Sequence, residues 1–157
     1  MPITYEIDIT NTSGATAITN AATVVAQLTV SAGKPIRLKR IELQSNQTGS
    51  TQTVIPLQLG TYATGTSTAG VTPTPRATNR GISTAASTAA RCLTATLGTT
   101  FTINNDWQWN GATPFDMVFG LLETQPEYAA STVVAVIIPA ASGTPSLTCK
   151  LTFEEFG

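Results

Sequence analysis

Residues 147–154 read LTCKLTFE, in which apolar and polar side chains alternate without interruption. A period of two is typical of a β-strand that turns one face to a hydrophobic core and the other face to water. The residues between the apolar ones are threonine, lysine and glutamate, which suit a solvated face. The residues that the alternation places inward are Leu147, Cys149, Leu151 and Phe153.

The same alternation recurs along the chain and predicts an all-β fold. It is already present at Ile3–Ile9, where isoleucine and tyrosine alternate with threonine and acidic residues. Threonine is abundant throughout, and its β-branched side chain favours strands. Turns rich in Gly, Pro, Asn and Ser separate the apolar segments, so eight or nine short antiparallel strands are expected in a sandwich or a barrel. The other expected strands are residues 22–30, 36–43, 55–59, 93–97, 101–107, 115–122 and 132–138.

One of these strands changes phase in its middle. Ile36 and Leu38 share one face of a regular strand, whereas the apolar residues from Ile41 onward fall on the other face. A β-bulge adds one residue and reverses the facing of every residue after it. We therefore expect a bulge at Lys39 or Arg40.

The composition excludes several classes of enzyme before any motif is considered. The 157 residues include no histidine and carry a net charge of −1, which excludes Ser-His-Asp and Cys-His catalysis and His-bearing zinc sites. The length corresponds to a single domain, residues 1–157. No bilayer-spanning stretch or secretory leader is recognised, so Cys92 and Cys149 are expected as reduced, buried thiols. No cofactor or metal is expected, and neither nucleic acid nor a membrane is an expected partner.

Residues 61–91 are the least regular part of the sequence. They are rich in Thr, Ala, Gly and Ser and show no apolar period, so we expect an extended, irregular arm without regular backbone pairing. Its only charged side chains are three arginines, and its prolines stiffen part of it toward polyproline II. Such an arm becomes ordered on contact with a neighbouring subunit or another partner. The residues expected to make this contact are Pro73, Pro75, Arg76, Arg80 and Arg91.

The tryptophans near position 107 allow two interpretations. Asp106 and Asp116 flank Trp107 and Trp109, which share one face at strand spacing. Two carboxylates across a cleft are the catalytic requirement of most glycoside hydrolases, and aromatic rings stack on sugars. Burial of both tryptophans in the core explains the same spacing and is the favoured interpretation. A ligand-stacking surface at Trp107 and Trp109 is the alternative.

Charges are segregated along the sequence. Seven of the eight cations lie between Lys34 and Arg91, where Glu42 is the single acid, and the remaining acids lie toward the two ends. If this segregation survives folding, it supports head-to-tail contacts between copies of the chain. The other possibility is that folding interleaves the blocks and mixes the signs.

Several short segments occur in a distinctive order. They are Tyr5-Glu6-Ile7, PIRLKRIE at 35–42, the stretch 65–75 with its Gly-Thr and Val-Thr-Pro elements, Pro126-Glu127, and Phe153-Glu154-Glu155. Together they resemble small β-sandwich virion proteins of tailed bacteriophages, a group that includes head decoration and cement proteins. The chain departs from that pattern in ending with Phe156-Gly157 and in carrying the two tryptophans.

The resemblance implies a non-enzymatic structural protein with a jelly-roll-like antiparallel β-sandwich. Such a protein forms a homotrimer, binds the major capsid protein and lies on the capsid exterior of the virion after synthesis in the host cytoplasm. The 61–91 arm would then contact the shell or a sister subunit. The competing class is a carbohydrate-binding or receptor-binding module of a tail fibre, which would use Trp107 and Trp109. A small glycoside hydrolase built on the acidic residues is a third class.

Overall fold

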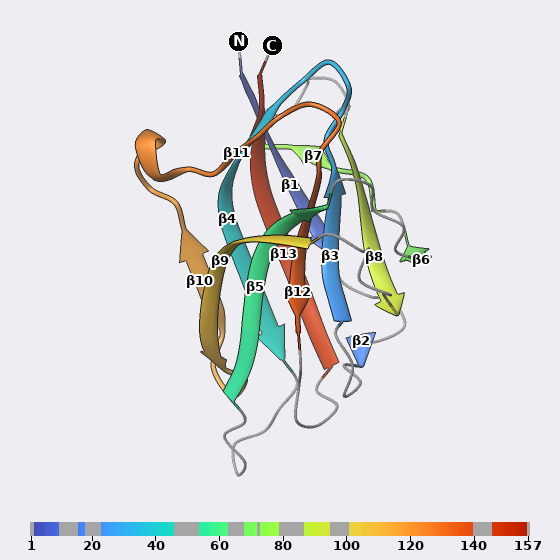
Figure 1. Cartoon of the computed structure of the whole chain (residues 1–157), viewed down its shortest axis with the longest axis vertical. Helices are drawn as coiled ribbons and strands as arrows, with labels where there is room; N and C mark the ends of the chain where they lie inside the picture. Colours follow the sequence, from blue (N-terminus) through green and yellow to red (C-terminus); the bar gives the residue numbers. More distant parts are fainter. Residues whose placement is uncertain are drawn as a thin grey trace.

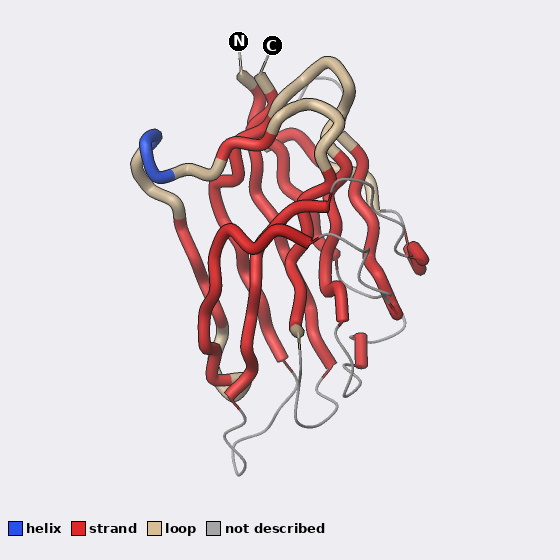
Figure 2. The backbone as a smooth tube through the Cα atoms, viewed as in Figure 1, coloured by secondary structure: helices blue, strands red, loops and turns tan. Residues whose placement is uncertain are grey.

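The computed structural model describes residues 2–9, 16–17, 23–45, 54–62, 68–71, 73–78, 87–94, 101–139 and 146–156. Two separate antiparallel sheets pack against each other with the hydrophobic core between them (Figures 1 and 2). In these ranges the one helical element is the short 3-10 turn η1 (Leu122–Thr124). The predicted β-sandwich is confirmed, and the barrel alternative is wrong because the two sheets do not join.

The strands divide between a sheet A and a sheet B. Sheet A contains β1 (Ile3–Ile9), β2 (Thr16–Ala17), β4 (Ile36–Ser45), β7 (Arg76–Ala77), β10 (Phe115–Val118), β11 (Glu127–Tyr128) and β13 (Ser146–Glu155). Its order is β10-β4-β13-β1-β7, with β11 paired to β4 and β2 paired to β13. Sheet B contains β3 (Thr23–Thr29), β5 (Val54–Tyr62), β6 (Thr68–Val71), β8 (Thr88–Thr94), β9 (Phe101–Asn110) and β12 (Val133–Ile138). Its order is β6-β8-β3-β12-β5-β9.

Eight of these strands are connected as a jelly roll. In chain order they are β1, β3, β4, β5, β9, β10, β12 and β13. In sheet A the order β1-β13-β4-β10 places the first, eighth, third and sixth of these strands side by side. In sheet B the order β3-β12-β5-β9 places the second, seventh, fourth and fifth side by side. This double Greek-key order defines the jelly roll. The strand order therefore agrees with the jelly-roll form that the sequence resemblance implied.

Three further strands come from the segment between β5 and β9, residues 63–100, which we call the insertion. β7 pairs with β1 at the outer edge of sheet A, β8 pairs with β3, and β6 pairs with β8 at the outer edge of sheet B. On the opposite side, β9 and β10 remain the outer strands of their sheets (Figure 1). The insertion therefore extends both sheets on one flank only.

The segment 61–91, which was expected to lack regular backbone pairing, is paired over part of its described length. The paired parts are the end of β5, β6, β7 and the first half of β8, whereas residues 73–75, 78 and 87 lie outside strands. The rest of the predicted arm lies outside the described residues. The strand expected at 93–97 is β8, which begins already at Thr88, because pairing with β3 extends it into sequence that has no apolar alternation.

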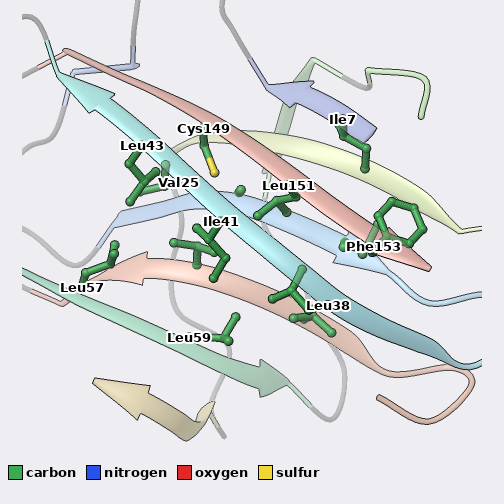
Figure 3. Packing of buried hydrophobic residues seen from close by; sticks show 14 of the residues in the cluster. Ile7, Val25, Leu38, Ile41, Leu43, Leu57, Leu59, Cys149, Leu151 and Phe153 are labelled. Carbon is green, nitrogen blue, oxygen red and sulfur yellow. The ribbon is translucent and has the colours of Figure 1, made fainter. Parts of the chain in front are cut away.

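The core receives side chains from the inner faces of both sheets (Figure 3). On β13 the predicted inward residues are each at most 3% exposed, so the alternation that opened the sequence is confirmed. Phe153 stacks on Tyr5 of the neighbouring β1, with ring centroids 5.6 Å apart. From sheet B, β5 contributes the fully buried side chains Ile55, Leu57 and Leu59.

Cys149 lies in this core as a free thiol. Burial in apolar surroundings raises the pKa of the thiol above its ordinary value, because the thiolate would lose its hydration. The prediction of a reduced, buried thiol is therefore confirmed for Cys149, whereas the side chain of Cys92 lies outside the described residues.

The bulge expected in β4 is present at Lys39. Strand β13 pairs Thr152 with Arg40 and Phe153 with Leu38, so Lys39 is the extra residue between the two pairs. The inserted residue restores the facing of the second half of the strand. The side chains that it keeps in the core are Ile36, Leu38, Ile41 and Leu43, each at most 1% exposed.

Gly60 on β5 lies beneath the ring of Phe101 on β9. A Cβ atom at position 60 would come within 2.3 Å of the carbonyl oxygen of Thr102 and 2.5 Å of Cζ of Phe101. Replacement Gly60→Ala is expected to lower the free energy of unfolding by about 1–3 kcal/mol, because the added methyl pushes the paired strands apart. Urea denaturation measures this loss.

A second glycine provides the matched control. A Cβ atom at Gly33 would meet no atom within 4 Å, so Gly33→Ala is expected to change the free energy of unfolding by no more than about 0.5 kcal/mol. Equal stability of the two variants would contradict the close approach of β9 to Gly60.

Candidate interaction surfaces

The outer face of sheet A carries a network of ion pairs centred on Arg40 of β4. Nε and Nη2 of Arg40 donate to the two carboxylate oxygens of Asp116 on β10, at 2.8 and 2.7 Å. Arg40 also lies 3.2 Å from a carboxylate oxygen of Glu42. The bidentate contact with Arg40 lowers the pKa of the Asp116 carboxyl group, because it stabilises the ionised form. Asp116 is therefore held as a carboxylate by its neighbour.

Other pairs on this face join cations to acids that are distant in the sequence. They arise because β4 lies between β10 and β13, and β13 lies between β4 and β1. Folding thus mixes the charge blocks, which was one of the two possibilities, and the cations of β4 carry no free excess charge. The further pairs are Lys150 with Glu6 and Glu42, Lys39 with Glu154, and Arg37 with Glu127.

Asp106 and Asp116, the acids considered for glycoside hydrolysis, lie on different sheets. Asp106 is exposed on β9 of sheet B, and Asp116 is bound by Arg40 on sheet A. A glycosidase acid needs a raised pKa so that it can deliver a proton. The contact with Arg40 acts in the opposite direction on Asp116, so this arrangement does not favour a catalytic pair.

The two tryptophans close the sandwich between β9 and β10. Both pack against Phe115, with centroid distances of 5.6 Å for Trp107 and 6.3 Å for Trp109. Trp109 is 3% exposed, and its Nε1 donates to the carbonyl oxygen of Thr113 at 2.7 Å. Core burial is confirmed for Trp109, whose ring is not accessible to a ligand. Trp107 is half-buried and packs on the edge of the core.

The first part of the insertion is fixed on β1 by backbone pairing. Arg76 lies opposite Glu6 in the β1–β7 ladder. The backbone N–H of Thr78 donates to the carbonyl oxygen of Thr4 at 3.0 Å. The segment is therefore ordered by the sheet itself and needs no partner for that purpose.

The five predicted contact residues of the insertion differ in their exposure. Arg76 is exposed, Pro73 is half-buried and Pro75 is buried. Pro75 therefore anchors the segment and does not extend toward a partner, contrary to expectation. Arg91 belongs to β8, where its backbone pairs with Val71, and its side chain is not among those described. Arg80 lies outside the described residues.

A buried carboxylate holds a second point of the insertion. Glu155 is 3% exposed, and its Oε1 accepts the backbone N–H of Ser87 at 2.6 Å. The Ser87 hydroxyl in turn accepts the backbone N–H of Ser31 at 3.3 Å. This contact was not predicted from the sequence, although extending the alternation of β13 by two residues past Phe153 places Glu155 on the inner face.

Four of the five large apolar side chains that are exposed in the described residues belong to β9, to β10 or to the turn that follows β10. We call this surface the open flank and define it as β9, β10 and residues 119–125. Val54 borders it, since it lies opposite Asn110 at the end of β9. The large apolar side chains exposed in the described residues are Val54 (58%), Ile103 (52%), Val118 (57%), Leu121 (69%) and Leu122 (62%).

Leu121 and Leu122 correct the predicted strand at 115–122. Strand β10 ends at Val118, and the chain then enters η1, which projects from the edge of the sandwich (Figure 1). The sequence already argued against a buried strand at Leu121 and Leu122. Adjacent residues of a strand face opposite sides, so an outer strand cannot bury both leucines.

The turn that carries the two leucines is held by several hydrogen bonds. The N–H of Phe119 donates to the carbonyl oxygen of Lys39, the bulge residue, at 2.9 Å. The side-chain amide of Gln125 donates to the carbonyl oxygen of Phe119 at 3.1 Å, and the N–H of Thr124 donates to that of Leu121 at 2.9 Å. A surface that is already ordered loses less entropy on binding. The open flank thus presents its leucines in a fixed geometry.

Among the described residues, no group of three or more His, Cys, Asp or Glu side chains is placed to hold a metal ion. Nor does this part of the chain contain a helix long and apolar enough to cross a membrane. Comparisons with family models, with curated proteins and with solved structures found no match. Function must therefore be inferred from the surfaces described above.

Proposed function

We propose that the chain is a non-enzymatic structural protein of a tailed-bacteriophage virion, which binds the major capsid protein on the outside of the head and reinforces the shell as a homotrimer. The sequence segments that resemble decoration and cement proteins support this proposal. The jelly-roll sandwich is compatible with it, because that fold occurs in viral capsid proteins as well as in lectins. A fold does not define a function by itself, so the surface has to supply the contact.

The observation that carries the proposal is the exposed guanidinium of Arg76 on the outer strand β7. Within the described part of the chain Arg76 makes no ion pair, whereas the cations of β4 and β13 are all engaged by acids of the same chain. The only other charged residues of the insertion are Arg80 and Arg91. An arginine-bearing flank suits carboxylates on a partner, since guanidinium groups bind them through two parallel hydrogen bonds.

Cosedimentation of the purified chain with heads of the phage that encodes it tests the proposal. Replacement of Arg76, Arg80 and Arg91 together by Ala is expected to weaken attachment at least about tenfold and to reduce its salt dependence, because the charged contacts are lost. The matched control compares two single replacements, Arg76→Ala and Lys34→Ala. Lys34 also lacks an ion pair among the described residues, so its replacement removes one unpaired cation outside the insertion and is expected to leave attachment unchanged.

Unchanged affinity and salt dependence in the triple variant would contradict this role of the arginines, and failure of the wild-type chain to bind heads would overturn the function. A glycan array probes the alternative, a carbohydrate-binding or receptor-binding module of a tail fibre. Glycan binding that is lost in Trp107→Ala would favour that alternative.

A further inference from the structure

The two flanks of the sandwich differ in how their outer strands are protected. The insertion extends both sheets on one flank, through β7 on sheet A and through β8 and β6 on sheet B. On the open flank the outer strands are β9 and β10. Soluble proteins protect outer strands with charged residues, with proline or by covering them. Strand β9 runs from Phe101 to Asn110 without proline and with one charged residue, Asp106.

The open flank also carries the exposed apolar side chains of the described residues. Leu121 and Leu122 are more than 60% exposed on a hydrogen-bonded turn, and Ile103 and Val118 are more than half exposed on the outer strands. Leu121 and Leu122 are adjacent, whereas Val118 lies on the outer face of sheet A and Ile103 on the outer face of sheet B. Burial of the two leucines against a partner is favourable, because it removes apolar surface from water.

The charges at the two flanks have opposite signs. Asp106 and Glu123 are exposed on the open flank and make no ion pair with another described residue, whereas Asp116 is neutralised by Arg40. On the other flank Arg76 is exposed, and the insertion contains no acidic residue. The open flank is therefore apolar and acidic, and the flank formed by the insertion is basic.

From this arrangement we propose that the open flank of one copy docks head to tail on the insertion flank of a second copy, with Asp106 and Glu123 facing Arg76. The inference rests on the self-association included in the proposed function. It assigns Arg76 to the contact between copies, so weakened head binding in an Arg76 variant reports loss of this contact as well as loss of a capsid contact, and the test below is made without capsids. A two-fold contact between two open flanks would bring the acids of both copies together, and like charges at an interface are unfavourable. A head-to-tail contact avoids this and leaves both flanks of each copy occupied when the assembly closes.

Sedimentation velocity over a range of concentrations, without capsids, tests the contact. The wild-type chain is expected to associate. Three variants are expected to weaken association at least about tenfold: Leu121→Ser with Leu122→Ser, Asp106→Arg with Glu123→Lys, and Arg76→Glu. All five side chains are exposed, so unchanged circular dichroism and thermal unfolding are expected and confirm that each variant is folded.

Mixing two of the variants provides the decisive measurement. Arg76→Glu places an acid opposite Asp106 and Glu123, and Asp106→Arg with Glu123→Lys places basic residues opposite Arg76, so in each variant like charges meet at the contact. In a mixture, each contact between the two variants again joins opposite charges, so two of the three contacts in a closed trimer are restored, and association is expected to return above the level of either variant alone. The control is Lys34→Glu, the same charge reversal in the turn between β3 and β4, which is expected to leave association unchanged.

Three outcomes would overturn the proposal. The first is a monomeric wild-type chain at about 100 μM in moderate salt, a concentration ~100 times a micromolar dissociation constant. The second is that the open-flank variants weaken association whereas Arg76→Glu leaves it unchanged. That result would indicate a two-fold contact between open flanks or another occupant of the open flank. The third is failure of the mixture to associate. If the chain passes these tests and still fails to bind heads, the proposed capsid function is overturned and the head-to-tail contact stands.

Discussion

Deletion of Lys39 is expected to unfold the protein or leave it only marginally stable. Without the bulge residue, β4 can keep its register with β13 on one side of position 39 only. Either Ile36 and Leu38 or Ile41 and Leu43 then turn from the core to solvent. Exposing two such side chains costs about 3–6 kcal/mol, at roughly 1.5–3 kcal/mol each. That loss is comparable to the whole stability of a typical domain, about 5–15 kcal/mol, and urea denaturation followed by circular dichroism measures it.

The deletion acts on a second element as well. The carbonyl oxygen of Lys39 accepts the N–H of Phe119, and the N–H of Leu38 donates to the carbonyl oxygen of Pro126 at 3.0 Å. A shifted β4 therefore also releases the turn that carries Leu121 and Leu122.

Substitution at the same position separates the backbone effect from the side-chain effect. Lys39→Ala keeps the residue count and removes the contact with Glu154, which lies 3.0 Å from the ammonium group. Partly exposed ion pairs contribute little, so the expected loss is about 1 kcal/mol or less. A deletion variant as stable as Lys39→Ala would contradict the requirement for the bulge.

The sequence alone predicts the strands that have one face in the core and one face in water, because their apolar and polar residues alternate. Leu147, Cys149, Leu151 and Phe153 are the clearest example, and the break in phase within 36–43 even locates the bulge. Strands β6 and β7 and the first part of β8 were missed for a physical reason. Their small and polar residues have no apolar period, and they become strands because the outer edges of β1 and β3 offer backbone partners.

The surface is predicted less well than the core, because it depends on which strands become neighbours. Arg40 and Asp116 are 76 positions apart, and only the register between β4 and β10 brings them together. Burial of Glu155 similarly depends on the contact with Ser87. For Leu121 and Leu122, in contrast, the adjacent pair in the sequence was sufficient to argue against a buried strand.

Phe153→Ala is expected to lower the free energy of unfolding by about 3–5 kcal/mol, the usual range for removing a buried phenylalanine side chain. Phe153 is fully buried in the middle of sheet A, opposite Tyr5 on β1 and Leu38 on β4. The flanking strands are held at their spacing by backbone ladders, so they cannot move inward to fill the cavity. The lost stacking with Tyr5 adds to the cost of the cavity.

Phe156→Ala is the matched control, because it removes the same side chain three residues further along the chain. Phe156 is only half-buried, with the guanidinium of Arg37 4.5 Å from the centre of its ring. A cation–π contact at a site of this exposure contributes about 0.5–1 kcal/mol, so a loss of about 1 kcal/mol is expected. Urea denaturation should shift the midpoint of Phe153→Ala far more than that of Phe156→Ala with little change in slope. Equal losses would show that the ring of Phe153 does not fill the core as the stacking on Tyr5 indicates.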